Sequence, residues 1–309
     1  MISRRQFTAV AWLGWVGASL TTAQHALALP ANAAQRDAAI QARLRELESA
    51  AQGRLGVHIL DTATGQEYGY RADERFMMLS SFKVLACALV LHRVDTGTES
   101  LERRIAYTAK DLIAWSPVTE KHANGDGMTL GQLCAATITT SDNTAANLIL
   151  SSYGGPTALT AFARQLGDQV TRLDRIEPEL NVKSAGDGRM DTTSPRAMLS
   201  TMQKLLLGQA LSVQSREQLQ LWLRGSTTGS QRLKAGLPSD WHIGDKTGTS
   251  KSDANDIGIV LPPNRAPLLV VAYLAESRAT SQLKDASIAA VGQLVGEIAS
   301  YASSLKSPR

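Results

Sequence analysis

The sequence has few of the residues that bind metal ions. It contains two cysteines and five histidines among 309 residues. The histidines beyond residue 28 are far apart, without an H-E-x-x-H motif or a paired C-x-x-C motif: His58, His92, His122 and His242. Zinc hydrolases bind their metal through such spaced motifs. We therefore expect neither a metal site nor a cofactor.

Positive charge and long apolar runs are also scarce. The formal net charge of +4 falls to +2 without residues 1–28, because that segment contributes Arg4 and Arg5 and no acid. Nucleic-acid binding needs clustered basic side chains, and a membrane span needs about 20 apolar residues in succession. Neither feature occurs after residue 28. We expect a soluble protein without stable contact to membranes or nucleic acids and, since no long apolar surface stripe is evident, a monomer.

The composition is that of a globular protein. Hydrophobic residues make up 43% of the chain and charged residues 19%, which excludes a disordered chain, a coiled coil and a collagen. There is no internal repeat. A chain of 309 residues can hold one large domain or two interleaved lobes.

The first 28 residues have the pattern of a cleavable export signal. Two arginines precede an apolar stretch from Phe7 to Leu20, and small residues end in an A-x-A pattern at Ala28. The start "SRRQF" resembles a twin-arginine signal, which exports proteins that have already folded. A membrane anchor is disfavoured because the stretch is short and contains Thr, Gly and Ser; a second cleavage point would follow Ala33. We predict a periplasmic protein that meets the twin-arginine export machinery in transit.

Hydrophobic periodicity divides the rest of the chain into three parts. Apolar residues three or four apart predict helices, and alternating ones predict strands. The expected order is a helix at 35–52, a hairpin at 55–70, mostly helices at 80–222, strands at 256–261 and 266–276, and a helix at 285–304. This order predicts an α+β protein in which one lobe combines about 34–75 with 233–309 and an all-helical lobe covers about 76–232. The polar segment 175–195 is expected to be a functional loop.

Three short motifs in this order are of chemical interest: S-x-x-K at Ser80 and Lys83, S-D-N at 141–143, and K-T-G at 246–248, just before the penultimate strand. Ser80 pairs with Lys83 because side chains three apart share a helix face. The apolar neighbours of Lys83 would bury it, and a buried lysine can lose its proton and act as a base. Alone, S-x-x-K more often begins an ordinary helix, and S-D-N is a good helix cap. Their order and spacing together are specific.

With these motifs the chain resembles the class A β-lactamases, which share the motif set with penicillin-binding proteins. The resemblance extends over essentially the whole chain after the signal and includes "SSFK", "SPVTEKH", "SDNTAANL", "RIEPELN" and "DKTGT". It implies the two-lobed serine β-lactamase fold. In that fold an antiparallel five-stranded sheet is flanked by helices from both chain termini, and the active site lies between this lobe and the all-helical one.

The resemblance implies a role for each motif in opening a β-lactam ring. Ser80 would be the nucleophile, Lys83 its neighbour in proton transfer, and Ser141 the relay that passes a proton to the leaving nitrogen. Backbone N–H groups of Ser80 and Thr249 would form the oxyanion hole.

Other residues of the motifs would bind the substrate. Asn143 would hold the side-chain amide of the substrate, while Lys246 and Thr247 would hold its carboxylate, with Gly248 also among the substrate-binding residues. Trp115 matches a position where an aromatic ring walls the site; a core tryptophan is the alternative.

The segment "EPELN" separates members that hydrolyse their acyl-enzyme from related proteins that stay acylated. By resemblance Glu177 activates the hydrolytic water and Asn181 helps to hold that water; the alternative is a surface acid before a proline. Whether Lys83 or Glu177 is the base for acylation stays open at this point. Arg175 and Asp191 resemble the ion pair that closes this loop in the family.

The spacing of the loop leaves that ion pair in doubt. Nine residues separate Asn181 from Asp191, one more than we expect of the family pattern. Asp187 is therefore a rival partner for Arg175.

Substrate range depends on positions outside the motifs. Asn255 occupies the position where many members carry an arginine for the substrate carboxylate. Arg232 matches a place where some members have a substitute guanidinium; the alternative is a solvated arginine beside a helix. Leu79 and Ser250 stand where carbapenem-hydrolysing relatives commonly have a disulfide, so we expect carbapenems to be poor substrates.

The two cysteines have two possible states. An even number of cysteines in an exported protein favours a disulfide, and two buried free thiols are the alternative. Cys87 and Cys134 match another disulfide position of the family, so the resemblance predicts that they pair.

The resemblance thus implies an enzyme that hydrolyses penicillins and cephalosporins and confers β-lactam resistance. One alternative is a penicillin-binding D,D-peptidase on the same fold, which would stay acylated; Glu177 with Asn181 argues against it. The other is a non-catalytic β-lactam sensor, which is normally tethered to a membrane segment that this chain lacks after its signal.

Overall fold

The computed structural model describes residues 32–186 and 188–304. The predicted export signal at 1–28 lies outside the described residues, and so does Asp187. Across the part of the chain that is described, no helix is long and apolar enough to cross a membrane.

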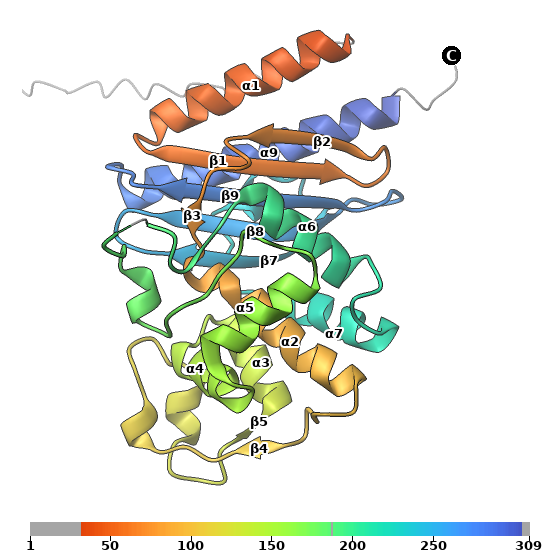
Figure 1. Ribbon diagram of the computed structural model, residues 1–309. Coiled ribbons are helices and arrows are strands. Elements are labelled where there is room, and N and C mark those ends of the chain that lie inside the picture. Colours follow the sequence, from red (N-terminus) through yellow and green to blue (C-terminus); the bar gives the residue numbers. More distant parts are fainter. Residues whose placement is uncertain (1–31, 187, 305–309) are drawn as a thin grey trace, which may run out of the picture.

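Five strands form one antiparallel sheet in the order β2-β1-β9-β8-β7 (Figure 1). They are β1 (Arg54–Asp61), β2 (Gln66–Tyr70), β7 (His242–Thr249), β8 (Ala254–Leu261) and β9 (Leu268–Ala275). Two short antiparallel pairs lie outside it: β3 (Phe76–Met77) with β6 (Thr192–Thr193), and β4 (Arg104–Ile105) with β5 (Met128–Thr129). The predicted five-stranded antiparallel sheet, built from both ends of the chain, is confirmed.

Within the five-stranded sheet, β7 is the strand that hydrophobic patterning did not predict, and the four short strands outside it were not predicted either. The K-T-G triad lies within β7 and not in a loop before the next strand. Its middle reads Gly-Asp-Lys-Thr-Gly, so polar residues replace the apolar alternation that announces a strand. Pairing with β8 along the full length of both strands holds it in place instead.

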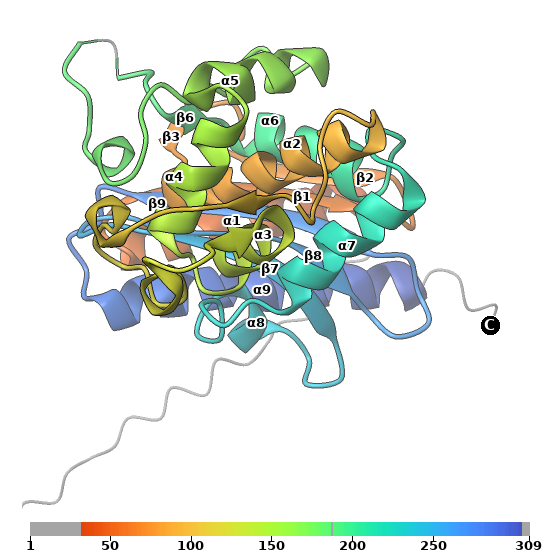
Figure 2. The same cartoon turned by 90° about the horizontal axis from the view of Figure 1, so that it is seen from below.

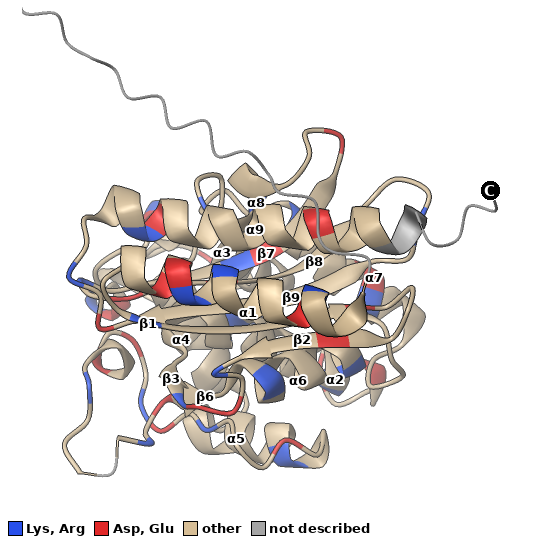
Figure 3. Ribbon diagram, turned by 90° about the horizontal axis from the view of Figure 1, so that it is seen from above, with Lys and Arg blue, Asp and Glu red and all other residues tan. Residues whose placement is uncertain are grey.

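The helices form two layers, one on each face of the sheet (Figures 1 and 2). Helices α1 (Ala33–Ala50) and α9 (Ser281–Ser304) run side by side over one face, with Lys, Arg, Asp and Glu along them (Figure 3). Six helices lie on the opposite side: α2 (Lys83–Asp95), α3 (Leu130–Thr139), α4 (Asn143–Ser152), α5 (Gly155–Gln165), α6 (Pro195–Leu206) and α7 (Val213–Arg224). The short α8 (Leu233–Gly236) packs against α9. Helix α6 contacts β1 and β9 directly.

The sheet separates two hydrophobic cores because its side chains alternate between faces. In β9, Val270 and Ala272 pack with α1 and α9, whereas Val271 and Tyr273 pack with the helices of the other side. Strand β1 does the same, with Val57 in the first core and Leu60 in the second. Strands β1, β8 and β9 are buried along nearly their whole length and therefore hold the motif-bearing segments on a rigid base.

Cys87 and Cys134 are free thiols in the structure, which corrects the expected disulfide. Both are completely buried, and Cys87 Sγ donates to the backbone carbonyl of Cys134, 3.7 Å away. The sulfur of Cys87 thus points at main chain. Burial, followed by the contact with Cys87, raises the pKa of the Cys134 thiol well above its usual range, so little reactive thiolate forms.

Candidate active site

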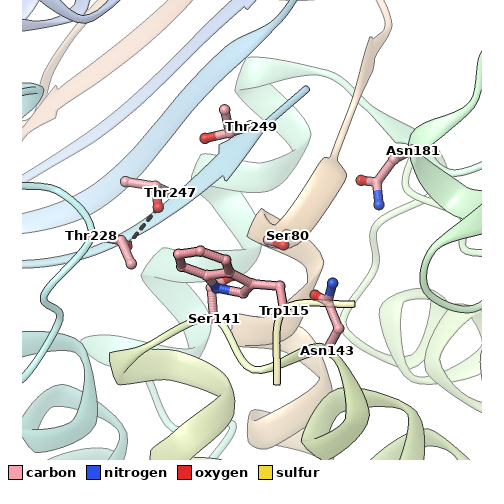
Figure 4. A pocket seen from close by; sticks show the side chains of 8 residues that line it. All are labelled: Ser80, Trp115, Ser141, Asn143, Asn181, Thr228, Thr247 and Thr249. Atoms are coloured by element: carbon pink, nitrogen blue, oxygen red, sulfur yellow. Dashed lines mark hydrogen bonds between the residues drawn. The ribbon is translucent and has the colours of Figure 1, made fainter. Parts of the chain in front are cut away.

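A cavity of about 380 Å³ opens between β7 and the helical side of the molecule (Figure 4). Eight side chains line it: Ser80, Trp115, Ser141, Asn143, Asn181, Thr228, Thr247 and Thr249. All but Thr228 were candidates from the sequence. Segments more than 160 residues apart in the chain therefore meet at one cavity.

Ser80 lies in a single 3-10 turn, Leu79–Phe82, and Lys83 begins helix α2. In a 3-10 turn residues three apart are eclipsed, so the two side chains leave the same side of the turn. Leu79 has a left-handed backbone, with φ +48°, which is uncommon for a residue other than glycine. A Cβ on Gly248 would lie 3.2 Å from the amide nitrogen of Ser80. Glycine at 248 thus lets β7 approach the backbone of Ser80 and brings Thr249 beside it.

Lys83 is completely buried among polar partners. Its Nζ donates to the Ser141 carbonyl at 2.8 Å and to Asn143 Oδ1 at 2.6 Å, and forms an ion pair with Glu177 Oε1 at 3.2 Å. Burial lowers the pKa of Lys83, and the carboxylate of Glu177 opposes that shift. The lysine is therefore a cation that can release its proton more readily than one in water.

The S-D-N motif is a helix cap and a part of the cavity at once. Asp142 is the N-cap of α4, and its carboxylate accepts from Ala145 N, Val118 N and Thr119 N at 2.9–3.0 Å. Ser141 has a left-handed backbone, with φ +61°. The buried Asp142 thereby fixes its two neighbours, Ser141 and Asn143, toward the cavity.

Glu177 lies at the base of the 175–195 loop and is 2% exposed. Ser80 Oγ donates to its Oε1 at 3.3 Å, and Asn181 Nδ2 donates to its Oε2 at 2.6 Å. Each carboxylate oxygen thus has a partner from the cavity. The surface acid considered as the alternative is excluded by this burial.

Asn147 in α4 binds the main chain of the 175–195 loop, a role that the sequence did not predict. Its Oδ1 accepts from the backbone N–H of Glu177 at 3.0 Å, and its Nδ2 donates to the carbonyl of Glu177 at 2.9 Å. Asn147 stands four residues after Asn143 in α4, so helical periodicity places both on one face. That spacing is a signal that could have found it.

Arg175 pairs with Asp191 in the structure. Arg175 Nε donates to Asp191 Oδ2 at 2.6 Å, and the amide nitrogens of Asp174 and Arg175 donate to Asp191 Oδ1 at 2.7 and 2.9 Å. Asp191 is completely buried. The loop is therefore closed by a carboxylate that binds both main chain and guanidinium, and the extra residue lies within the loop between them.

Lys246 enters the site from β7. Its Nζ donates to Ser141 Oγ at 3.0 Å, and Ser141 Oγ also lies 3.3 Å from Lys83 Nζ. Burial, together with the positive charge of Lys83, lowers the pKa of Lys246 to about 7. One hydroxyl thus lies between two lysines, both of which hold their protons less firmly than usual.

Thr228 joins the cavity from the loop that follows α7. Its Oγ1 lies 2.6 Å from Thr247 Oγ1, and either hydroxyl can donate (Figure 4). No sequence motif marks Thr228, because the contact depends on how this loop packs over β7.

Arg232 takes neither of the two expected positions. It is 7% exposed and does not line the cavity. Its guanidinium donates to the carbonyls of Gly248 and Asn255 at 2.9 and 2.8 Å, to Thr249 Oγ1 at 2.8 Å and to Asp285 Oδ1 at 2.7 Å. This arginine therefore ties β7 to β8 and orients Thr249.

Asn255 and Trp115 border the site in different ways. Asn255 donates from Nδ2 to the carbonyls of Met77 and Met78 at 2.9 and 3.1 Å, which ties β8 to the segment before Ser80. Trp115 is 65% exposed, and its Nε1 donates to the carbonyl of Thr140 at 3.0 Å. The indole is thus a fixed wall of the cavity, and the core alternative is wrong.

Comparisons with known proteins agree with this geometry. The model of the β-lactamase enzyme family matches residues 39–299. The β-lactamases OXY-2 and OXY-1 of Klebsiella oxytoca are each 46% identical over 260 residues, which is 84% of this chain and 89% of theirs. An ancestral (GNCA) class A β-lactamase structure has a TM-score of 0.82 and 57% identity, and covers 84% of this chain and 99% of its own. The chain therefore belongs to the β-lactamase enzyme family, within class A.

Proposed function

We propose that this enzyme hydrolyses the β-lactam ring of penicillins and cephalosporins through an acyl-enzyme on Ser80, which water activated by Glu177 then cleaves. In the cell this activity would confer resistance to these antibiotics. The observation that carries the proposal is the position of Glu177, whose Oε1 accepts from the hydroxyl of Ser80 and whose Oε2 accepts from Asn181.

Acylation begins when Ser80 Oγ attacks the lactam carbonyl. The 3.3 Å hydrogen bond to Glu177 Oε1 gives the serine proton an acceptor, and this supports Glu177 as the base of this step. Lys83, which contacts the same oxygen, stabilises the carboxylate until it takes the proton. The amides of Ser80 and Thr249 would bind the oxyanion, because Gly248 brings β7 against the backbone of Ser80.

The ring opens when its nitrogen leaves with a proton from Ser141 Oγ. That hydroxyl contacts the Nζ atoms of Lys83 and Lys246, so either cation can replace the proton. When Lys83 does so, its neutral amine takes the serine proton from Glu177 Oε1, 3.2 Å away, and Glu177 is again a carboxylate for deacylation. The substrate carboxylate would lie against Lys246 and the hydroxyls of Thr247 and Thr249, and Asn143 would hold the side-chain amide. Trp115 would close the outer side of the cavity.

Deacylation needs a water between Glu177 and the ester carbon. Asn181 is bound to Glu177 Oε2 and lines the cavity, so it can hold that water where the carboxylate takes a proton from it. General base catalysis raises the rate of such a step by roughly two to four powers of ten. Positioning of the water raises it further.

The test is turnover of benzylpenicillin by residues 29–309, with intact protein mass sampled through the reaction. We expect many turnovers with little acylated protein, and accumulation of the penicilloyl adduct in Glu177→Gln. Glu179→Gln, an exposed acid of the same loop, is the matched control and should resemble the wild type. One equivalent consumed by the wild type, with the adduct persisting, would instead indicate a D,D-peptidase or a sensor.

Two further proposals concern range and location. Because Leu79 and Ser250 stand where carbapenem-hydrolysing relatives commonly have a disulfide, carbapenems should be poor substrates. Efficient turnover of imipenem would contradict this. The twin-arginine pattern supports a periplasmic location, and the lack of a long apolar surface stripe in the sequence supports a monomer. Replacement of Arg4 and Arg5 by lysine should retain the protein in the cytoplasm, as cell fractionation would measure; unchanged export would favour another route.

A further inference from the structure

Two aspartates share the face of β7 and β8 that lies opposite Lys246. In the register of these antiparallel strands Asp245 pairs with Gly258 and Asp256 pairs with Thr247. Directly paired residues lie on one face, and neighbours along a strand alternate. Asp245, Thr247 and Asp256 therefore lie on one face and Lys246 on the other. Asp245 is 3% exposed and Asp256 is completely buried.

The packing around these carboxyl groups leaves little access for water. A Cβ on Gly229 would lie 1.9 Å from Asp245 Oδ2, so the backbone of Gly229 is pressed against that carboxyl group. Ser226 Oγ donates to the same oxygen at 3.4 Å. Asp256 Oδ2 accepts from the backbone N–H of Leu233 at 3.1 Å.

One oxygen of the pair has no donor. Among the residues that the structure describes, none donates to Asp256 Oδ1, although that atom is buried. Asp256 pairs with Thr247, two positions along β7 from Asp245, so the two buried carboxyl groups are diagonal neighbours on this face. Two ionised carboxylates offer acceptors alone, so a hydrogen bond between them requires a proton on one of them. A proton on Asp256 Oδ1 accounts both for the missing donor and for two neighbouring carboxyl groups that are buried together.

Two cations act on each member of the pair. Lys246 and Lys234 act on Asp245, and Arg232 and Lys246 act on Asp256. Arg232 already binds Asp285. Burial and then the charge of Asp245 raise the pKa of Asp256 well above its usual range. Burial also raises the pKa of Asp245, but Lys246 opposes that shift first. Asp245 is thus the better place for the single negative charge.

We propose that Asp256 holds a proton and donates it to ionised Asp245, so that the pair sets one negative charge beside Lys246 and keeps its ammonium charged. Both aspartates are then positioning residues for the substrate carboxylate. The role of Lys246 rests on the proposed function; the shared proton does not. Lys83 and Glu177 also act on Lys246. Burial and the charge of Lys83 lower the pKa of Lys246, whereas Glu177 and the pair of aspartates raise it.

The first measurement observes the proton itself in the wild-type enzyme. Infrared spectroscopy of residues 29–309 with isotope-labelled aspartate should show a protonated carboxylic acid at neutral pH, which disappears in Asp256→Asn. Its absence in the wild type would overturn the proposal. This readout needs no substrate, so it stays distinct from a failure of β-lactam turnover.

The second measurement compares two matched variants by their pH profiles. In Asp256→Asn the amide donates where the protonated acid did, so the alkaline limb of kcat/KM for benzylpenicillin should stay in place. Asp245→Asn removes the charge, so the limb should move about one pH unit lower and KM near neutral pH should rise about tenfold. Equal shifts in both variants would show that both aspartates carry charge. A shift in Asp256→Asn alone would show that the charge is on Asp256. Either result would overturn the proposal.

Discussion

The two groups of buried charges at the cavity differ in what they bind. Around Ser80, Lys83 and Glu177 contact each other and the reactive hydroxyls: Ser80 Oγ donates to Glu177 Oε1, and Lys83 Nζ lies 3.3 Å from Ser141 Oγ. Behind β7, Arg232 donates to two carbonyls, a hydroxyl and Asp285. Groups that must pass protons thus lie beside hydroxyls that can give and take them, while the group that maintains structure is held by main chain and by a carboxylate.

The largest effect expected from this comparison is loss of catalysis on removing Lys83. Lys83→Met deletes the cation that contacts Glu177 and Ser141, so kcat/KM for benzylpenicillin should fall about 10²–10⁴-fold. Stopped-flow acylation rates measure this. Lys110→Met, at an exposed lysine, is the control. If kcat/KM falls less than about tenfold, then Lys83 does not pass protons in the reaction and does not differ from Arg232 in this respect.

Removing Arg232 should act on stability more than on chemistry. Arg232→Ala leaves the buried carbonyls of Gly248 and Asn255 without their donor, so the free energy of unfolding should fall by about 2–4 kcal/mol. Urea denaturation measures the change, and Arg224→Ala at the exposed end of α7 is the control. If Arg232→Ala keeps full stability but loses turnover, then Arg232 belongs with the proton-passing group.

The two groups should also differ in their response to pH. Lys246, with a pKa of about 7, loses its charge as pH rises through that value, whereas arginine side chains in proteins are effectively always charged. Binding of a substrate carboxylate favours the charged lysine, so kcat/KM should decline above pH 7 by up to about tenfold per pH unit, and kcat should decline at higher pH. A β-lactam whose carboxylate is esterified should lack this limb. If kcat/KM declines above pH 7 in the same way for both substrates, then a group other than Lys246 causes the decline.

The smallest expected effect tests the hydroxyl contact between the groups. Thr228→Val removes the 2.6 Å hydrogen bond to Thr247, so KM should rise about two- to tenfold with kcat little changed. Steady-state kinetics measure it. Thr227→Val, which breaks an exposed bond to the Thr139 carbonyl, is the matched control. Equal effects in both variants would mean that loop packing, and not the Thr228 hydroxyl, is responsible.

Much of the sheet and most of the cavity could be anticipated from local pattern. Alternation predicted β1, β8 and β9, but β7 escaped because Asp245 and Lys246 interrupt its apolar pattern. The motifs named Ser80, Ser141 and Thr247, because residues with reactive side chains recur at short, fixed spacings. Thr228 and Asn147 were not anticipated. Thr228 belongs to no motif, and Asn147 lies within the segment SDNTAANL but binds the main chain of Glu177, a contact that depends on how the loop packs on α4.

By itself, the sequence determined the alternation of helices and strands, the reactive groups and the position of Glu177 in a long polar loop, since these depend on neighbours a few residues apart. Tertiary structure decided that Arg175 pairs with Asp191, that Arg232 is buried behind β7, that Cys87 faces a carbonyl, and that Asp245 and Asp256 are buried on one face of β7 and β8. These contacts depend on strand register and on packing between distant segments, and neither is encoded in any short stretch of the chain.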